Sequence, residues 1–467
     1  MSKIEAFEIE NPHQKRFSKF NDDEEDSINK SNLLDNEDEI GLNYGNKKKS
    51  NPNKSKNNFL RFKGDNEFYG VLNLIASTIG GGFVTFPSLL QTAGIITSLI
   101  CFIIVSICVY FSLNLLRNFI ISTNLFSLSG ITKKLLGKRW LKIYAFSAVI
   151  FYLSIEINYV NLIVEYGTKG LFSMEENYLI IIFYLVSCIL EIILCLYTSK
   201  ISHIHVLSLI SVFCFIFIVI VLLFYSFGSL MNEEIKDKFS SGKFFMPLDS
   251  FLKYIASICA CFIEYVYSYS SHCSFPTLIG NLETKEEKTK RVVNIFFAFT
   301  TIMYIIISVF GYISQINIVE NQKTLILFTE DYLHGYFNKF LQFIFILFFI
   351  SLIPMRYIVI RDNYLSLFSH EITYKIELIF ISVNMIIVNI ISYFCSNDTN
   401  IIFSLNEIFG GVFGVVICFI LPVIIYISIN NKAEIKSILG YIMGIFFLIV
   451  GLFTAGYSFC EKILKII

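Results

Sequence analysis

Eleven apolar runs, each long enough to cross a bilayer as a helix, dominate the sequence from residue 68 onward. A helix of about 20 residues spans a hydrocarbon core of about 30 Å. The chain is 55% apolar and only 16% charged, whereas about a quarter of the residues in a soluble domain carry charge. Lipid is therefore the solvent for most of the chain, and we predict an all-α membrane protein. The predicted spans are 68–89, 94–119, 141–164, 178–198, 204–229, 252–278, 292–315, 340–367, 376–394, 402–429 and 438–459.

The first 66 residues differ sharply from the rest. They are rich in Asn, Lys, Asp, Glu and Ser and show almost no apolar periodicity. Such a composition predicts a disordered tail, and without an apolar run this segment does not resemble a signal peptide. We therefore divide the chain into a tail, residues 1–66, and a membrane domain, residues 67–467.

Basic residues in the short loops predict the orientation of the spans, because cytoplasmic loops carry more Lys and Arg. If the tail is cytoplasmic, the outer side carries fewer basic residues, namely Lys169, Lys236, Lys238, Lys243, Lys253, Lys323 and Lys339, with Lys462 and Lys465 at the C-terminal end. The inner loops then carry Lys133, Lys134, Lys138, Arg139, Lys142, Lys200, Lys285, Lys288, Lys290, Arg291, Arg356, Arg361, Lys375, Lys432 and Lys436. We expect a cytoplasmic N-terminus in either the plasma membrane or a vacuolar or lysosome-like membrane.

Several function classes find no support in the sequence. The 37 basic and 37 acidic residues balance, so there is no electrostatic basis for nucleic-acid binding. Most cysteines lie within apolar runs, and no disulfide framework or zinc motif is readable. The histidines lack a spacing such as HExxH. We therefore expect no cofactor, no metal site and no enzyme activity, and partners limited to the lipid bilayer and a small solute.

The first span contains three consecutive glycines, Gly80, Gly81 and Gly82, preceded by Ser77 and Thr78. Each glycine costs a helix about 1 kcal/mol relative to alanine. Irregular backbone at membrane depth is tolerated only where it is buried in protein or lines a cavity, and broken helices of this kind hold substrates in transporters. The alternative is close packing of helices through small residues. We predict a break here.

The sixth span is also unusually polar. Tyr267–Ser271 is a run of five hydroxylated residues, followed by His272 and, four residues later, by Pro276, which distorts a helix. The first and sixth spans occupy equivalent positions if spans 1–5 and 6–10 are inverted repeats. Paired interruptions in the two halves are the best pointer from sequence to a central binding site.

With these features the sequence resembles the amino acid/auxin permease family of amino acid transporters, within the group that shares the LeuT-type fold. The resemblance rests on the ordered segments Asn73–Pro87, Ala93-Gly94, Tyr267–Pro276, Pro354-Met355-Arg356 and Gly410-Gly411 through Leu421-Pro422. It implies about eleven helices in a 5+5 inverted repeat with broken helices 1 and 6. It also implies secondary active transport of amino acids by alternating access.

The same resemblance implies where an amino acid binds. The backbone around the first break is expected to hold the substrate carboxylate, and the sixth span is expected to contribute to the pocket for the amino group and side chain. The implied substrate-binding residues are Ser77, Thr78, Gly80, Gly81, Gly82, Tyr159, Tyr267, Ser268, Ser271 and His272.

Two departures from the family bear on the coupling ion. Sodium-coupled relatives resemble one another in carrying Asn where this chain has Ala76, and Thr roughly where it has Leu347. Both changes remove oxygen ligands that a hard cation needs. The four-residue spacing from His272 to Pro276 is similar to that of the proton-coupled branch. We expect a proton-coupled carrier or exchanger of small neutral or cationic amino acids. A sodium-coupled symporter and a non-transporting amino-acid sensor stay open as alternatives.

Acidic residues within apolar spans are functional candidates, because a charge at the centre of a bilayer costs at least about 2.5 kcal/mol. We predict that Glu156, Glu264 or His272 takes part in proton coupling. Residues near the ends of spans are expected to reach the headgroups or the interface. These are Glu191, Glu377, His203 and His205, while Glu407 lies near the start of the tenth span.

Overall fold

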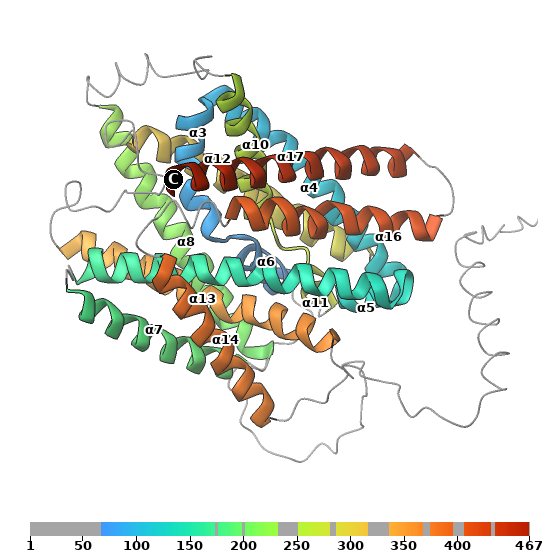
Figure 1. Cartoon of the computed structure of the whole chain (residues 1–467), viewed down its shortest axis with the longest axis horizontal. Coiled ribbons are helices and arrows are strands. Elements are labelled where there is room, and N and C mark those ends of the chain that lie inside the picture. The colour runs from blue at the N-terminus through green and yellow to red at the C-terminus, as the bar shows by residue number, and fades with distance from the viewer. Residues whose placement is uncertain are drawn as a thin grey trace, which may run out of the picture. The chain divides into compact units, whose positions relative to one another are not determined.

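The structure is a computed structural model, and every regular element among its described residues is a helix (Figure 1). The described residues are 67–172, 176–198, 201–231, 251–280, 286–315, 336–367, 374–395, 406–430 and 435–466. The predicted tail, residues 1–66, lies outside them, as do several loops that carry basic residues.

Among the described residues, ten helices are long and apolar enough to cross a membrane, and one bent pair completes a set of eleven spans. The predicted number and order of spans are therefore confirmed. The elements are α2 (Glu67–Thr78), η1 (Gly81–Thr85), α3 (Phe86–Ala93), α4 (Ile95–Thr123), α5 (Leu128–Leu136), α6 (Lys138–Glu165), η2 (Tyr166–Leu171), α7 (Asn177–Tyr197), α8 (Ile201–Leu230), α10 (Phe251–Ser268), α11 (Phe275–Gly280), α12 (Glu286–Gln315), α13 (Tyr336–Leu367), α14 (Tyr374–Cys395), η3 (Gly410–Gly414), η4 (Val416–Ile420), α16 (Leu421–Asn430) and α17 (Ile435–Ile466).

The first span breaks where the glycines predict. α2 ends at Thr78, Gly80 is extended with φ −117° and ψ −173°, and the chain resumes as η1 and α3. The two parts meet at an angle of 53°. Pro87 lies in the first turn of α3, where a missing backbone N–H leaves no helical hydrogen bond unmade.

The sixth span breaks as well. α10 ends at Ser268, and α11 begins only at Phe275. Within the gap, the Ser271 amide donates to the Tyr269 carbonyl at 2.8 Å. Pro276 is the second residue of α11, just as Pro87 is the second residue of α3. The two half-helices thus restart with the same Phe-Pro pair, and both predicted breaks are confirmed.

One helix was not predicted. The short α5 lies in the connection between the second and third spans. The Ser127 hydroxyl caps its first turn by accepting a hydrogen bond from the Gly130 amide at 3.1 Å. Gly137, with φ +85°, ends α5 and allows α6 to start in a new direction.

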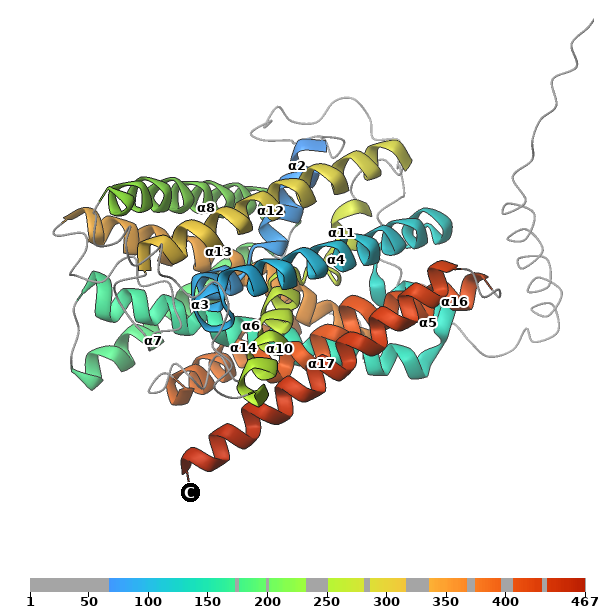
Figure 2. The same ribbon diagram turned by 90° about the horizontal axis from the view of Figure 1, so that it is seen from above.

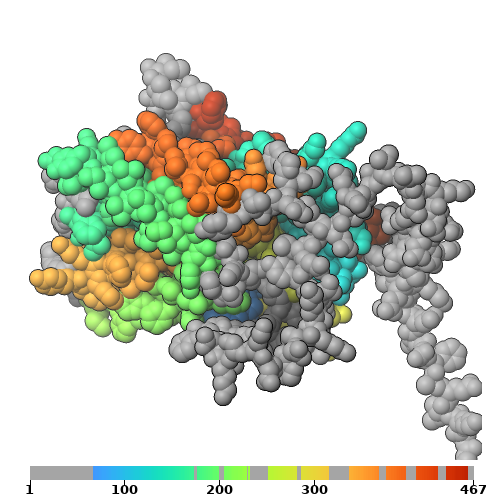
Figure 3. Space-filling view, turned by 90° about the horizontal axis from the view of Figure 1, so that it is seen from below, coloured from blue at the N-terminus to red at the C-terminus, as the bar shows by residue number. Residues whose placement is uncertain are grey.

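Two helices form the centre of the bundle. α6 and α13 pack along each other, and 83% and 78% of their most apolar stretches are buried. In α7 only 28% of that stretch is buried, and large side chains such as Leu185 and Ile189 are exposed, as expected of a lipid-facing helix. Figure 3 shows this outer face, with α7 and α8 in green and α13 and α14 in orange.

The two broken spans lie among neighbours that hold both of their halves. α12 contacts α2 and α3 of the first span together with α8. α10 of the sixth span packs against α4 and α17 (Figure 2). The backbones of α17 and η3 are in close contact. A Cβ atom on Gly451 would overlap the Gly411 carbonyl oxygen, so only glycine fits there.

This contact predicts that Gly451→Ala destabilises the protein by about 1–3 kcal/mol, the usual cost of overpacking. The measurement is the thermal unfolding midpoint of the purified protein in detergent. Gly456→Ala is the matched control, because Gly456 lies in the same helix with open space around its Cβ position. Equal midpoints for the two variants would contradict the close approach of α17 and η3.

Candidate functional site

The glycines of the first break lie directly against α6 and α10. A Cβ atom on Gly80 would be 2.8 Å from the Tyr159 hydroxyl oxygen, and one on Gly81 would be 3.0 Å from Asn158 Nδ2. A Cβ atom on Gly82 would overlap the Ser268 side chain at the end of α10. The glycines therefore have both of the predicted roles. They interrupt the helix, and they allow the neighbouring helices to pack closely against the break.

Tyrosine hydroxyls satisfy backbone carbonyls that the breaks release. Tyr304 of α12 lies within hydrogen-bonding distance of the Thr78 carbonyl, at 3.2 Å, and of the Ser268 carbonyl, at 3.0 Å. Tyr152 of α6 donates to the Ser270 carbonyl at 2.8 Å. Side chains from the intact helices thus replace the missing helical hydrogen bonds, as buried backbone requires.

Arg356 of α13 lies beside the first break. Its side chain is only 2% exposed, and its Nη2 donates to the Tyr159 hydroxyl at 3.2 Å. The same Nη2 would be 3.7 Å from a Cβ atom on Gly80. The guanidinium also faces the rings of Tyr152 and Tyr159, at 5.7 and 5.8 Å from their centres. The prediction that Arg356 belongs to a cytoplasmic loop is therefore wrong.

Polar groups without partners gather around the breaks. Within the described part of the chain, Arg356 has no carboxylate partner and its Nε makes no hydrogen bond. The same holds for both ring nitrogens of His272 and for the Ser271 hydroxyl, although both residues are buried. Across the described ranges, no group of three or more His, Cys, Asp or Glu side chains could hold a metal ion.

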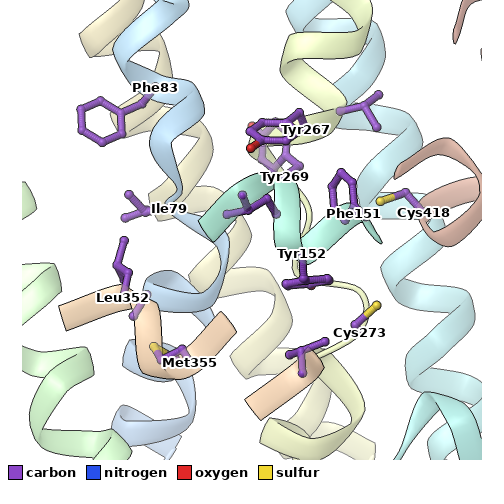
Figure 4. Close-up of a cluster of buried hydrophobic side chains, with 14 of the residues drawn as sticks. Ile79, Phe83, Phe151, Tyr152, Tyr267, Tyr269, Cys273, Leu352, Met355 and Cys418 are labelled. Atoms are coloured by element: carbon purple, nitrogen blue, oxygen red, sulfur yellow. The ribbon is translucent and has the colours of Figure 1, made fainter. Parts of the chain in front are cut away.

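Three of the remaining predicted site hydroxyls donate to carbonyls of their own helices. Ser77 and Thr78 both donate to the Leu74 carbonyl, and Ser268 donates to the Glu264 carbonyl. Tyr267 is buried with its ring against Phe151, at 5.6 Å between centres. Figure 4 shows the apolar part of this cluster, including Ile79, Phe83, Tyr152, Tyr267, Cys273 and Leu352.

Two predicted proton carriers lie at different places around the breaks. Glu156 of α6 is fully buried, one turn before Tyr159, and its Oε2 accepts from Asn384 of α14 at 2.8 Å. Its Oε1 has no hydrogen-bond partner among the described groups. Glu264 of α10 is 2% exposed, and its Oε2 lies 3.5 Å from the Thr85 hydroxyl of η1.

The structure shows the partners of the two acidic residues expected at the headgroups. Glu191 is fully buried and accepts from Ser187 at 2.7 Å and from Asn389 of α14 at 2.8 Å. Glu377 forms an ion pair with Arg361 at 2.9 Å. The expectation for Glu191 is wrong, because Asn389 on the neighbouring α14 holds its buried carboxylate within the protein. Glu377 lies in the first turn of α14, and its place at the headgroups stays a prediction.

The other titratable candidates lie away from the breaks. His205 of α8, expected at the interface, is half-buried and bonded through Nδ1 to Asn73 of α2 at 2.8 Å. Glu407 accepts a hydrogen bond from Ser458 of α17. The side chain of His203 lies outside the described residues.

The structure thus brings the three glycines, Tyr159 and Ser268 into contact and adds residues that the sequence did not assign to the site. These are Tyr152, Asn158, Tyr304 and Arg356. The signal for Arg356 was present, because a basic residue within an apolar run is a functional candidate by default. No local signal marks the three others.

A comparison with known protein families identifies the family of this chain. Residues 63–464 match the family described as transmembrane amino acid transporter protein. The chain belongs to this family. A comparison with curated proteins found no matching sequence.

The following solved structures with a similar fold are transporters. A manganese transporter from Eremococcus coleocola, bound to an aromatic bis-isothiourea compound, has a TM-score of 0.54 and 13% identity, covering 87% of this chain and 89% of that one. A variant of the same transporter has a TM-score of 0.56 with the same identity and coverage. A Na⁺-coupled sialic acid symporter has a TM-score of 0.52 and 14% identity, covering 84% and 89%. At these identities the similarity shows the LeuT-type fold alone.

We predict that Gly81→Leu abolishes amino-acid flux while the protein still inserts into the membrane. The added side chain must displace Asn158 and Tyr159, which lie 3.0 and 3.3 Å from the Cβ position. The measurement is uptake in proteoliposomes, with insertion checked by the yield and gel-filtration profile of the purified protein. Gly228→Leu is the control, because Gly228 has open space around it. Wild-type flux from Gly81→Leu would show that the break has no part in transport.

Proposed function

We propose that this protein is a secondary active amino acid transporter that works by alternating access, coupled to protons or running as an exchanger. The observation that supports the proposal is the set of buried polar groups around the two interrupted helices: within the described residues, Arg356 Nε, both ring nitrogens of His272 and the Ser271 hydroxyl have no hydrogen-bond partner. Interrupted helices at equivalent places in two repeats bind solutes in transporters of this architecture.

The charge at the first break argues against sodium coupling. Arg356 is a fixed positive charge beside Gly80. Two like charges 4 Å apart repel by about 4 kcal/mol at an effective dielectric constant of 20. Ala76 is buried in α2 and offers no side-chain oxygen, and neither does Leu347 in α13. A sodium ion near this break would therefore meet repulsion without the oxygen ligands that it prefers.

Among the candidate proton carriers, the surroundings favour Glu156. It is fully buried in lipid-embedded protein, where the neutral acid is far less costly than the carboxylate. It lies one turn from Tyr159, which contacts both the first break and Arg356. A proton on Glu156 is thus separated from the site by a single side chain. The ionisable groups that face Glu156 are Tyr159 on α6, Glu191 and Cys195 on α7, and Arg356 and Tyr357 on α13.

We further propose that the N-terminus is cytoplasmic and that the protein resides in the plasma membrane or a vacuolar or lysosome-like membrane. The asymmetry of basic residues supports the orientation. Arg356 no longer counts toward that asymmetry, because it is buried at the first break. The remaining basic residues of the inner loops still outnumber those of the outer loops.

Uptake by proteoliposomes tests the coupling. We expect a labelled amino acid to accumulate when the side from which it enters is more acidic, and we expect sodium to have no effect. The measurement uses a panel of amino acids with and without a pH gradient and with and without sodium. Uptake that requires sodium and ignores the pH gradient would refute proton coupling. Saturable binding without any flux would identify a sensor instead of a carrier.

We predict that Glu156→Gln removes the response to the pH gradient and leaves exchange of amino acids at equal pH. Glutamine keeps an oxygen that accepts from Asn384 but cannot release a proton. The matched control is Glu191→Gln, a fully buried acid on the next helix whose two oxygens both have partners. Continued uphill uptake by Glu156→Gln, driven by the pH gradient, would exclude Glu156 as the coupling residue.

A further inference from the structure

We propose that the Arg356 guanidinium binds the carboxylate of the transported amino acid and so selects for solutes that carry one. This inference rests on the proposed transport function and names a substrate-binding residue that the sequence did not assign. It is supported by the burial of Arg356, its surroundings and its place between the two breaks.

Arg356 carries a buried positive charge. Arg356 is 2% exposed and stays protonated under all physiological conditions. Buried charges in proteins are normally paired or hydrogen-bonded, because an isolated one is costly. In the described part of the chain the guanidinium has one hydrogen bond, to the Tyr159 hydroxyl, and no ion pair. The nearest aromatic rings stabilise it only weakly, since cation–π contacts contribute about 0.5–2 kcal/mol.

The Arg356 guanidinium lies between groups that belong to, or contact, the two breaks. Nη2 would be 3.7 Å from a Cβ atom on Gly80, which places the guanidinium against the extended backbone of the first break. On its other side the guanidinium faces Tyr152, whose hydroxyl donates to the Ser270 carbonyl within the second break. A carboxylate at Arg356 would therefore lie between the two interrupted helices, where the family resemblance places an amino acid.

Arg356 has a donor group left for a substrate, and other unpartnered polar groups lie in the second break. Nη2 is shared with Tyr159, whereas Nε has no partner in the described structure. A guanidinium presents parallel N–H groups that match the two oxygens of a carboxylate. His272 and Ser271 are also buried without partners in the second break and can accept hydrogen bonds from a substrate amino group. The site thus offers complementary ends to a zwitterion.

Selectivity follows from this arrangement. An amine without a carboxylate would leave the guanidinium unpaired and add a second positive charge, so it should be rejected. The amide of a transported amino acid should be rejected as well, because its uncharged carboxamide cannot form an ion pair with the guanidinium. The carboxylate, more than the side chain, would then define the class of substrate.

The experiment compares an amino acid with its own amide. Competition against labelled amino-acid uptake, and thermal stabilisation of the purified protein by each ligand, are measured for wild type, Arg356→Lys and Arg356→Gln. Loss of one partner of a buried charge pair costs at least about 2 kcal/mol, or about 30-fold in affinity. We expect wild type to prefer the acid over the amide by at least about 30-fold and Arg356→Gln to show a ratio close to one. Arg356→Lys should fall between them, because lysine keeps the charge but loses the two parallel donors.

The ratio separates binding from folding, because a variant that is merely destabilised keeps the wild-type preference. Lys339→Gln is the matched control, since Lys339 is an exposed basic residue of the same helix. An unchanged acid-to-amide ratio in Arg356→Gln would overturn the proposal, even with transport intact. If Arg356→Gln is not recovered as folded protein, equal binding of acid and amide by wild type would also overturn it. Absence of any amino-acid binding or flux in wild type would instead refute the proposed function.

Discussion

The structure depends on how backbone groups are satisfied where two membrane helices stop. In lipid an unsatisfied carbonyl costs several kcal/mol, so interrupted helices survive only beside groups that replace the lost bonds. Tyr304 lies within reach of the Thr78 carbonyl at the end of α2 and of the Ser268 carbonyl at the end of α10. A hydroxyl has a single proton to donate. The ends of α2 and α10 therefore share one hydrogen-bond donor, which ties the two breaks to each other and to α12.

Intact helices supply the remaining support, which explains why α6 and α13 are the most buried of the bundle. Tyr152 and Tyr159 on α6 face the second and first breaks, respectively, and Arg356 on α13 lies against both rings. The same pair of helices continues outward into a polar contact, where Asn384 of α14 holds Glu156. The candidate substrate site and the candidate proton carrier are thus built on one pair of long, buried helices, while the broken helices pack against it.

The sequence predicted those features that a short stretch of chain encodes. Eleven apolar runs, three adjacent glycines and the polar run ending at His272 each act locally, and the spans and both breaks follow from them. The Phe-Pro pairs at Phe86 and Phe275 restart both half-helices and could have been recognised as a repeat. What could not be predicted are partners far apart in the chain. Tyr304 is 226 residues from Thr78, and Glu191 is 198 residues from Asn389. From the sequence alone, which does not show the contact with Asn389, Glu191 is expected at the end of a span.

Arg356 shows how such long-range placement changes the functional argument. Its positive charge acts on Glu156 of the neighbouring α6. A substrate carboxylate held by Arg356 would offset that charge, and the carboxylate form of Glu156 would lose its support. By linkage the effect is reciprocal, so that a proton on Glu156 favours substrate at Arg356 by the same factor. Under the proposed proton coupling, this reciprocity would link the binding of a proton to the binding of an amino acid without direct contact between the two.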